Sequence, residues 1–156
     1  MDGVASGFSA SDYLTVSRPT LDTNDFELKT CFTTGAISNQ RIITTMTGTS
    51  TMSGVLITSS NLVARFYNGT EVFIISSNTT LVANTKYYAY MYRQGTTIAL
   101  KLSTDNQTWE NVTQTILATD SIVLANTFGI GRSGQSTFEG SIDLNHTYIK
   151  VNGQAR

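Results

Sequence analysis

The most informative segment of the chain runs from Lys86 to Trp109 and reads KYYAYMYRQGTTIALKLSTDNQTW. Two runs of alternating side chains flank residues 94–96 (Gln-Gly-Thr), and this pattern predicts a β-hairpin. Successive side chains of a strand point to opposite faces, so the second run has one aliphatic face. That face consists of Ile98, Leu100 and Leu102. It needs an apolar partner on the neighbouring strand, and the first run offers Tyr87, Ala89 and Met91.

This register turns a row of tyrosines away from the core. The row consists of Tyr88, Tyr90 and Tyr92. Ala99 and Lys101 share its face across the hairpin. We call this outer surface the tyrosine face. An aromatic file on the outer face of a sheet is typical of an interaction surface, so the sequence predicts a binding module.

The composition favours one all-β domain spanning residues 1–156. A chain of 156 residues is long enough to bury about 70% of its unfolded surface as a single domain. Only 13% of the residues are charged, and Thr, Ser, Asn and Gly fill the polar positions. Thr, Tyr, Val and Ile suit a half-buried pleated surface. The net charge of -1, without a Lys/Arg cluster, argues against a nucleic-acid partner.

Signals of processing favour a protein that folds in a reducing cytoplasm. Cys31 is the only cysteine, so no disulfide is expected within the chain. Residues 1–7 have neither a basic start nor an apolar stretch, so we expect no signal peptide. No apolar run approaches ~20 residues, and we expect no membrane insertion. Without a secretory signal, the Asn-X-Thr triplets should stay unmodified; they begin at Asn68, Asn78, Asn106, Asn111 and Asn145.

Further short strands are predicted along the chain. They cover residues 12–17, 26–32, 41–46, 55–58, 62–67, 71–75, 110–117, 128–131, 142–144 and 148–151. Polar loops are expected at 47–53 and 76–85. Many short strands with frequent turn signals and no amphipathic helix predict a two-sheet antiparallel jelly-roll sandwich. The shared alternation phase places these residues in its core: Phe26, Leu28, Phe32, Leu100, Leu102 and Trp109.

The strand at 26–32 alternates cleanly between two faces. Its inward positions are Phe26, Leu28, Thr30 and Phe32, and its outward positions are Glu27, Lys29 and Cys31. The later segment 103–109 resembles the Asp-box turn of sialidase-like propellers, although it is one residue short and lacks the glycine. We expect Asp105 and Asn106 to shape this turn through side-chain-to-backbone bonds.

Six segments together resemble a known family. They are GFSASDYL at 7–14, FEL at 26–28 with FTTG at 32–35, STD at 103–105 with Trp109, GIGR at 129–132, FEGSIDL at 138–144 and YIKVNG at 148–153. Over nearly the whole chain, their order and spacing resemble the concanavalin A-like, laminin G-like jelly-roll domains of bacteriophage virion proteins, especially tail-fibre and receptor-binding proteins. The resemblance implies two stacked antiparallel sheets and a non-catalytic role in adhesion, carbohydrate recognition or virion assembly.

The chain departs from the family pattern in two places. Relatives often carry charged residues where Tyr90 and Tyr92 stand, which indicates a specialised tyrosine face. Many relatives also continue with a tryptophan after the position of Gly153, and this chain has none there. The second departure indicates a trimmed or differently capped terminus.

The candidate ligand-binding residues follow from the tyrosine face. Sugars pack their C–H groups on aromatic rings while neighbouring side chains bind the hydroxyls. The candidate site comprises Tyr88, Tyr90, Tyr92, Lys101, Arg65 and Tyr67, the last two expected on adjacent strands. Two alternatives remain: another subunit covers the tyrosines, as in a homotrimeric fibre, or a local loop buries them.

Other chemistry has weak support in the sequence. Glu139 and Asp143 form the nearest acidic pair, but Glu139 is expected in a turn before the strand, and no third carboxylate follows. His146 is the only histidine, so neither a nucleophile–base arrangement nor a zinc cluster is evident. The oxygen-rich turn formed by Asp22, Asn24 and Asp25 has ligand types suited to calcium, but a solvated polar turn explains it better. We therefore expect no catalysis, no metal and no cofactor.

The functional expectation is a phage virion module, made in the host bacterial cytoplasm, that binds host-surface glycan or cell-wall polysaccharide through the tyrosine face. The alternative is a capsid-decoration or fibre module in which that face contacts a second copy or other virion proteins.

Overall fold

The computed structural model describes residues 3–9, 13–17, 19–45, 51–123, 128–133 and 136–155. Its strands are β1 (Val4–Ser6), β2 (Leu14–Val16), β3 (Phe26–Thr34), β4 (Gln40–Thr45), β5 (Gly54–Thr58), β6 (Asn61–Tyr67), β7 (Val72–Thr80), β8 (Lys86–Gln94), β9 (Thr97–Ser103), β10 (Glu110–Thr115), β11 (Phe128–Ile130), β12 (Arg132–Ser133), β13 (Ser136–Thr137), β14 (Gly140–Val151) and β15 (Gln154–Ala155). Within these described ranges there is no α-helix, and therefore no helix with the length and apolar character of a membrane span.

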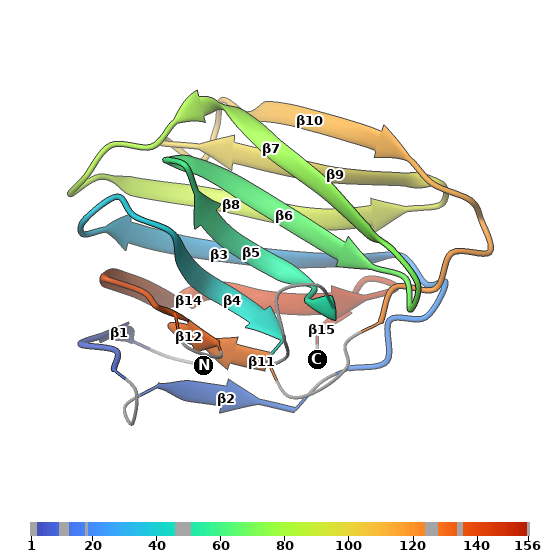
Figure 1. Cartoon of the computed structure of the whole chain (residues 1–156), viewed down its shortest axis with the longest axis horizontal. Helices are drawn as coiled ribbons and strands as arrows, with labels where there is room; N and C mark the ends of the chain where they lie inside the picture. Colours follow the sequence, from blue (N-terminus) through green and yellow to red (C-terminus); the bar gives the residue numbers. More distant parts are fainter. Residues whose placement is uncertain are drawn as a thin grey trace.

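Two antiparallel sheets stack face to face (Figure 1). The first sheet has the strand order β1-β14-β3-β8-β9-β10, with β15 also paired to β14. The second sheet has the order β2-β11-β4-β5-β6-β7, and β12 forms a small separate hairpin with β13. The fold is a two-sheet antiparallel jelly-roll sandwich, as the sequence predicted.

The central hairpin has the predicted register. Ala89 pairs with Leu102 and Met91 with Leu100 across β8 and β9, and all four side chains are buried between the sheets. Tyr87 is buried in the same phase, with its ring centroid 5.8 Å from that of Phe32. From the second sheet, side chains of β4, β5 and β6 complete one continuous core; they include Ile43, Val55, Ile57, Leu62, Ala64 and Phe66.

Two strand predictions were wrong in detail. The predicted polar loop at 76–85 begins too early, because β7 continues to Thr80 with main-chain pairing to β6. The two predicted strands at 142–144 and 148–151 are one strand, β14. An irregularity in the pairing with β3 between Asp143 and Tyr148 interrupts its side-chain alternation, which made it look like two. Residue 12 of the strand predicted at 12–17, residue 46 of the strand predicted at 41–46, and residues 47–50 of the predicted loop lie outside the described ranges.

A third correction concerns Trp109, which does not lie in the core. Its indole is half-buried on the outer face of the first sheet. The reason is strand phase: Val112 packs toward the core, whereas Asn111 pairs with the outward Lys101, and Trp109 shares the phase of Asn111. The prediction gave Trp109 the same phase as the core residues of the preceding strand, whereas the pairing of β10 gives it the opposite phase.

One end of the sandwich is tied together by a buried arginine. Arg93, at the end of β8, is 2% exposed and pairs with Ile98. Its guanidinium donates hydrogen bonds only to main-chain carbonyl oxygens among the partners found in the described ranges. Nε reaches Gly95 at 3.0 Å, Nη2 reaches Ala118 at 3.2 Å and Nη1 reaches Asp120. These bonds fasten the segment after β10 to the central hairpin.

The two sheets also meet along one edge, where β7 lies beside β10 (Figure 1). The carboxylate of Glu110, the first residue of β10, accepts hydrogen bonds from the main-chain N–H groups of Asn78 and Thr79 on β7. A side chain of the first sheet thereby satisfies main-chain donors of the second.

Candidate functional site

The tyrosine face carries a central row of alternating aromatic and cationic side chains. Tyr90 on β8 lies between Lys29 on β3 and Lys101 on β9 in the strand register. The row continues to Tyr148 on β14 beyond Lys29, and to Asn111 on β10 beyond Lys101. The structure therefore brings the predicted site residues Tyr90 and Lys101 together in the middle of the first sheet.

All three predicted tyrosines face away from the core. Tyr88, Tyr90 and Tyr92 alternate along β8 with buried residues, and each is half-buried. A local segment covers part of Tyr90, because the ring of Trp109 packs on it with centroids 5.0 Å apart. The rings are thus neither sealed by a loop nor fully exposed, and Trp109 adds a fourth aromatic group to the face. Its strand phase was the signal that could have placed it there.

The rings and charges line a groove of about 530 Å³ on this face. Its lining consists of Glu27, Lys29, Tyr90, Tyr92, Gln94, Lys101, Asn106 and Trp109. A second hollow of about 360 Å³ shares Glu27, Tyr92 and Gln94 with the first and continues toward Lys150 and Gly153. The two hollows form one extended depression with aromatic groups and hydrogen-bonding groups side by side.

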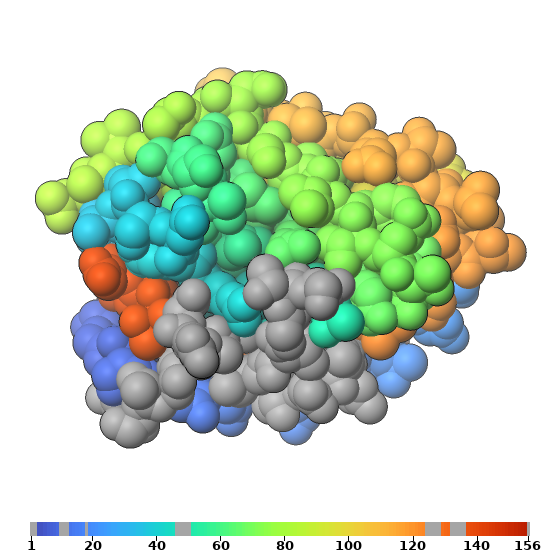
Figure 2. Space-filling view, viewed as in Figure 1, coloured from blue at the N-terminus to red at the C-terminus, as the bar shows by residue number. Residues whose placement is uncertain are grey.

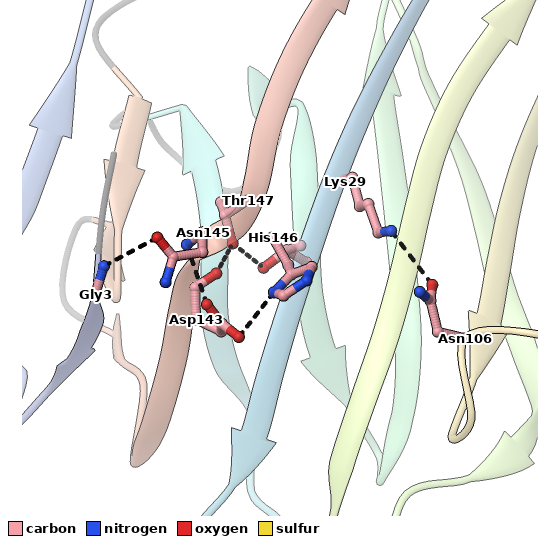
Figure 3. A network of polar contacts seen from close by, with 8 residues as sticks. Gly3, Lys29, Asn106, Asp143, Asn145, His146 and Thr147 are labelled. Atoms are coloured by element: carbon pink, nitrogen blue, oxygen red, sulfur yellow. Dashed lines mark hydrogen bonds and ion pairs between the residues drawn. The ribbon is translucent and has the colours of Figure 1, made fainter.

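Lys29 forms a buried cation at the floor of this groove. Only 8% of the residue is exposed, although it has the outward phase of β3. Figure 3 shows its side chain reaching toward the loop after β9, where Nζ donates to Asn106 Oδ1 at 3.3 Å. The ammonium also lies 5.0 Å from the ring centroid of Tyr90 and 5.9 Å from that of Tyr88, within cation–π range.

A tight turn between β9 and β10 positions Asn106 and Trp109. Ser103 Oγ accepts from the N–H groups of Asp105 and Asn106, and Asp105 Oδ1 accepts from those of Gln107 and Thr108. The hydrogen bonds from Thr108 and Gln107 lower the pKa of the Asp105 carboxyl to about 2. The prediction that Asp105 shapes this turn through side-chain-to-backbone bonds is confirmed, whereas the side chain of Asn106 serves Lys29.

Other lysines also lie over tyrosine rings. Lys101 Nζ is 5.7 Å from the ring centroid of Tyr92, and Lys86 Nζ is 5.3 Å from that of Tyr88. The hydrogen bond with Tyr88 raises the pKa of the Lys86 ammonium. The stems of these lysines therefore cover aromatic surface.

At the β14 side of the face, Glu27 joins two outward groups. The hydroxyl of Tyr148 donates to Glu27 Oε1 at 2.8 Å, and Lys150 Nζ lies 3.9 Å from the same oxygen. Burial, followed by this hydrogen bond, raises the pKa of the Tyr148 hydroxyl. This carboxylate is therefore already engaged within the protein.

The irregular part of β14 contributes a polar network at one end of the face (Figure 3). His146 Nδ1 lies 2.9 Å from Asp143 Oδ2, and the Asn145 N–H donates to Asp143 Oδ1 at 3.0 Å. The hydrogen bond with His146 lowers the pKa of the Asp143 carboxyl. Cys31 pairs with Asp143 and has the outward phase, but it is fully buried, and burial raises the pKa of its thiol. The hydrogen bonds of Asp143 with Asn145 and His146 stabilise the irregular part of β14.

The prediction that Arg65 and Tyr67 join the tyrosine face is wrong. Both residues lie on β6 in the second sheet. They have the opposite phase to the core residue Phe66, so they face outward on the other side of the sandwich. Figure 2 views the molecule from this side, with the green segments of β6 and β7 toward the viewer. There Tyr67 donates its hydroxyl proton to the carbonyl oxygen of Gly69 at 2.8 Å. Local alternation gave the phase of β6 correctly but not the sheet to which it belongs.

The acidic side chains considered for catalysis or calcium have protein partners or stand alone. Glu139 is exposed just before β14 begins at Gly140, as expected. Asp22 accepts a hydrogen bond from the Ser121 hydroxyl at 2.6 Å, and Asp25 accepts one from the Gly95 N–H at 2.7 Å. Among the residues that the structure describes, no group of three or more His, Cys, Asp or Glu side chains is placed to hold a metal ion.

Comparison with known proteins gives matches in structure alone. No protein-family model matches the sequence, and neither does any curated protein. The structure of mouse laminin α1 chain domains LG4-5 superposes with a TM-score of 0.71 at 12% identity, over 99% of this chain and 44% of that one. The fold is laminin G-like. The LG1-3 region of the laminin α2 chain matches with a TM-score of 0.68 at 13% identity, over 92% of this chain and 30% of that one.

Two further structures share this fold. One is the CBM40 module of Ruminococcus gnavus IT-sialidase, solved with α2,3-sialyllactose; it has a TM-score of 0.61 and 13% identity, over 98% of this chain and 92% of that one. The other is the enzymatically active domain of tailspike protein 2 from bacteriophage CBA120, with a TM-score of 0.63 and 9% identity, over 89% of this chain and 24% of that one. The chain spans less than half of the laminin structures that it matches.

Proposed function

We propose that this domain is a non-catalytic carbohydrate-binding module and that the tyrosine face is its binding surface. The observation that carries the proposal is the groove of about 530 Å³ in which Tyr90, packed against Trp109, lies between Lys29 and Lys101. The site joins ring faces for a pyranose to charged and amide groups for its hydroxyls, which is the composition that sugar recognition requires.

The shape of the site favours a polymer over a small molecule. The depression runs along an outer sheet face, and its two hollows are joined through Glu27, Tyr92 and Gln94. A saccharide chain crossing this surface would contact several rings in succession. Structures that share the fold include a sialidase carbohydrate-binding module solved with a sialylated sugar, which supports this use of the scaffold.

We further propose that the domain belongs to a phage virion, is made in the host bacterial cytoplasm, and meets host-surface glycan or cell-wall polysaccharide there. The support is the resemblance of the sequence segments to phage virion jelly rolls and the shared fold of a phage tailspike domain. Other virion proteins would then be its structural partners.

The test compares Tyr90→Ala with Tyr67→Ala, a matched loss of a tyrosine ring from the outer face of the other sheet. A glycan array of bacterial surface polysaccharides identifies the ligand. Trp109 is the only tryptophan and lines the groove, so its fluorescence reports titration of that ligand. Loss of a central aromatic anchor costs ~2 kcal/mol of binding free energy, so Tyr90→Ala should weaken binding roughly thirtyfold. Tyr67→Ala should bind like the wild type. Equal binding by all three proteins would refute the site.

A second candidate function is a contact between copies of the chain. The half-exposed cluster of Tyr90, Tyr92 and Trp109 favours it, since such aromatic residues are enriched at protein interfaces. Light scattering after size exclusion separates the two functions. A stable trimer that Tyr90→Ala dissociates indicates an interface, and a monomer leaves the face free for glycan.

A further inference from the structure

All four lysines of the chain project from the tyrosine face. Lys29 and Lys101 flank Tyr90 in the register, Lys86 pairs with Thr33, and Lys150 pairs with the outward Glu27. The whole chain has a net charge of -1, so this gathering of lysines on one face is not a consequence of a basic composition. A face that concentrates cations attracts negatively charged ligands.

The carboxylates described on this face are engaged with groups other than the two lysines that flank Tyr90. Glu27 contacts Tyr148 and Lys150, and Asp143 contacts His146. Within the described ranges, no carboxylate lies at ion-pair distance from the lysines on β3, β8 and β9. The positive charges of Lys29 and Lys101 are therefore available to a ligand.

Lys29 makes the strongest case for an anion. Burying an ammonium group without a counter-charge is unfavourable, and Lys29 is 8% exposed. Its partners among the described residues are the Asn106 amide oxygen at 3.3 Å and the π faces of Tyr88 and Tyr90. An anionic group in the groove would supply the missing charge.

The two lysines beside Tyr90 serve separate anionic groups. They stand two strands apart, which is about 10 Å between their backbones. Lys29 leans over Tyr88 and Tyr90, whereas Lys101 leans over Tyr92, toward the other end of the row. One carboxylate would not engage both ammonium groups at their full strength, but repeated charges along a polymer would.

Resting on the carbohydrate-binding function above, we propose that the ligand is an acidic polysaccharide. Carboxylate groups on neighbouring sugars bind Lys29 and Lys101 while a ring between them stacks on Tyr90 and Trp109. Both features are required: the charges select the acid, and the aromatic groups select a sugar backbone.

The experiment uses three polymers: polygalacturonic acid, its fully methyl-esterified form with the same backbone, and poly(glycerol phosphate), which has the charge without sugar rings. Binding is measured by affinity electrophoresis and by Trp109 fluorescence at several salt concentrations. The variants are Lys29→Met and Lys101→Met, which keep the aliphatic stem. Arg65→Gln removes the same charge from the other sheet and serves as the control.

We expect polygalacturonic acid to bind best, with affinity falling as salt rises. Each lysine variant should weaken binding about tenfold, the value of one charge-assisted contact, and Arg65→Gln should bind like the wild type. Equal binding of acid and ester, or lysine variants that bind like the wild type, overturns acid selection and leaves carbohydrate binding in place. Equal binding of poly(glycerol phosphate) and polygalacturonic acid overturns the role of the sugar ring. No binding of any polysaccharide, here or on the array, overturns both proposals.

Discussion

Tyr87 and Tyr90 stand three positions apart on β8. Replacing Tyr87 by alanine should lower the free energy of unfolding far more than replacing Tyr90. Tyr87 is 2% exposed, packs 5.8 Å from Phe32, and its hydroxyl oxygen accepts the Val82 N–H at 2.8 Å. Removing a buried aromatic ring costs about 3–5 kcal/mol of unfolding free energy. Tyr90 is half-buried on the outer face, so Tyr90→Ala opens no core cavity. It loses the contact with Trp109, worth about 1 kcal/mol.

The free energy of unfolding is measured by urea titration with circular dichroism, and a variant with an unchanged m-value reports stability alone. Tyr87→Phe isolates the hydroxyl: it removes the acceptor of the Val82 N–H. Val82 is exposed, so water can take over that acceptor role, and the change should cost only about 0.5–1.5 kcal/mol. If Tyr90→Ala unfolds the domain while Tyr87→Ala is harmless, the strand register is inverted and the tyrosine face does not exist.

Three further changes test the frame around the site. Leu100→Ala empties a fully buried position between the sheets and should lower the unfolding free energy by ~2–5 kcal/mol in urea; a negligible loss contradicts the core assignment. Arg93→Met removes the charged donor of hydrogen bonds to main-chain carbonyl oxygens and should cost about 2 kcal/mol, with faster hydrogen exchange in the segment after β10; unchanged exchange there would show that Arg93 does not hold this segment. Asp105 has a pKa lowered to about 2, so its stabilisation is complete above its ordinary pKa of 3.8 and is lost as pH falls through 2. Thermal melts between pH 2 and 5 should show this dependence in the wild type and a reduced one in Asp105→Asn; identical profiles exclude the role.

Strand phase was predictable from the sequence wherever one face is apolar. In the central hairpin, Ile98, Leu100 and Leu102 demand an apolar partner, and only one phase of β8 supplies it. That single constraint determined the orientation of every tyrosine on β8, and the structure has the same phase. The sandwich was predictable for the same reason, because many short strands along the chain show the same alternation of side chains.

The composition of the site was less predictable, because it depends on contacts between distant segments. Lys29 looked like an ordinary outward lysine, and its burial arises only when the turn after β9 brings Asn106 over it. Trp109 was assigned the phase of the core residues, because the turn between Ser103 and Glu110 hides how the phase of β9 carries over to β10. Arg65 was assigned to the wrong sheet, since the alternation along β6 says which way a side chain points but not which strand lies beside it.

The bond between Glu110 and β7 has a consequence for solubility. Edge strands offer main-chain N–H groups to which an extended segment of another molecule can add, and this is a common route to aggregation. At Asn78 and Thr79 those donors are occupied by a carboxylate from the facing sheet. An incoming strand would have to displace a charged acceptor before it could pair. Glu110 therefore hinders the addition of further strands along this edge. Many copies of the domain could then be held close together without their sheets joining.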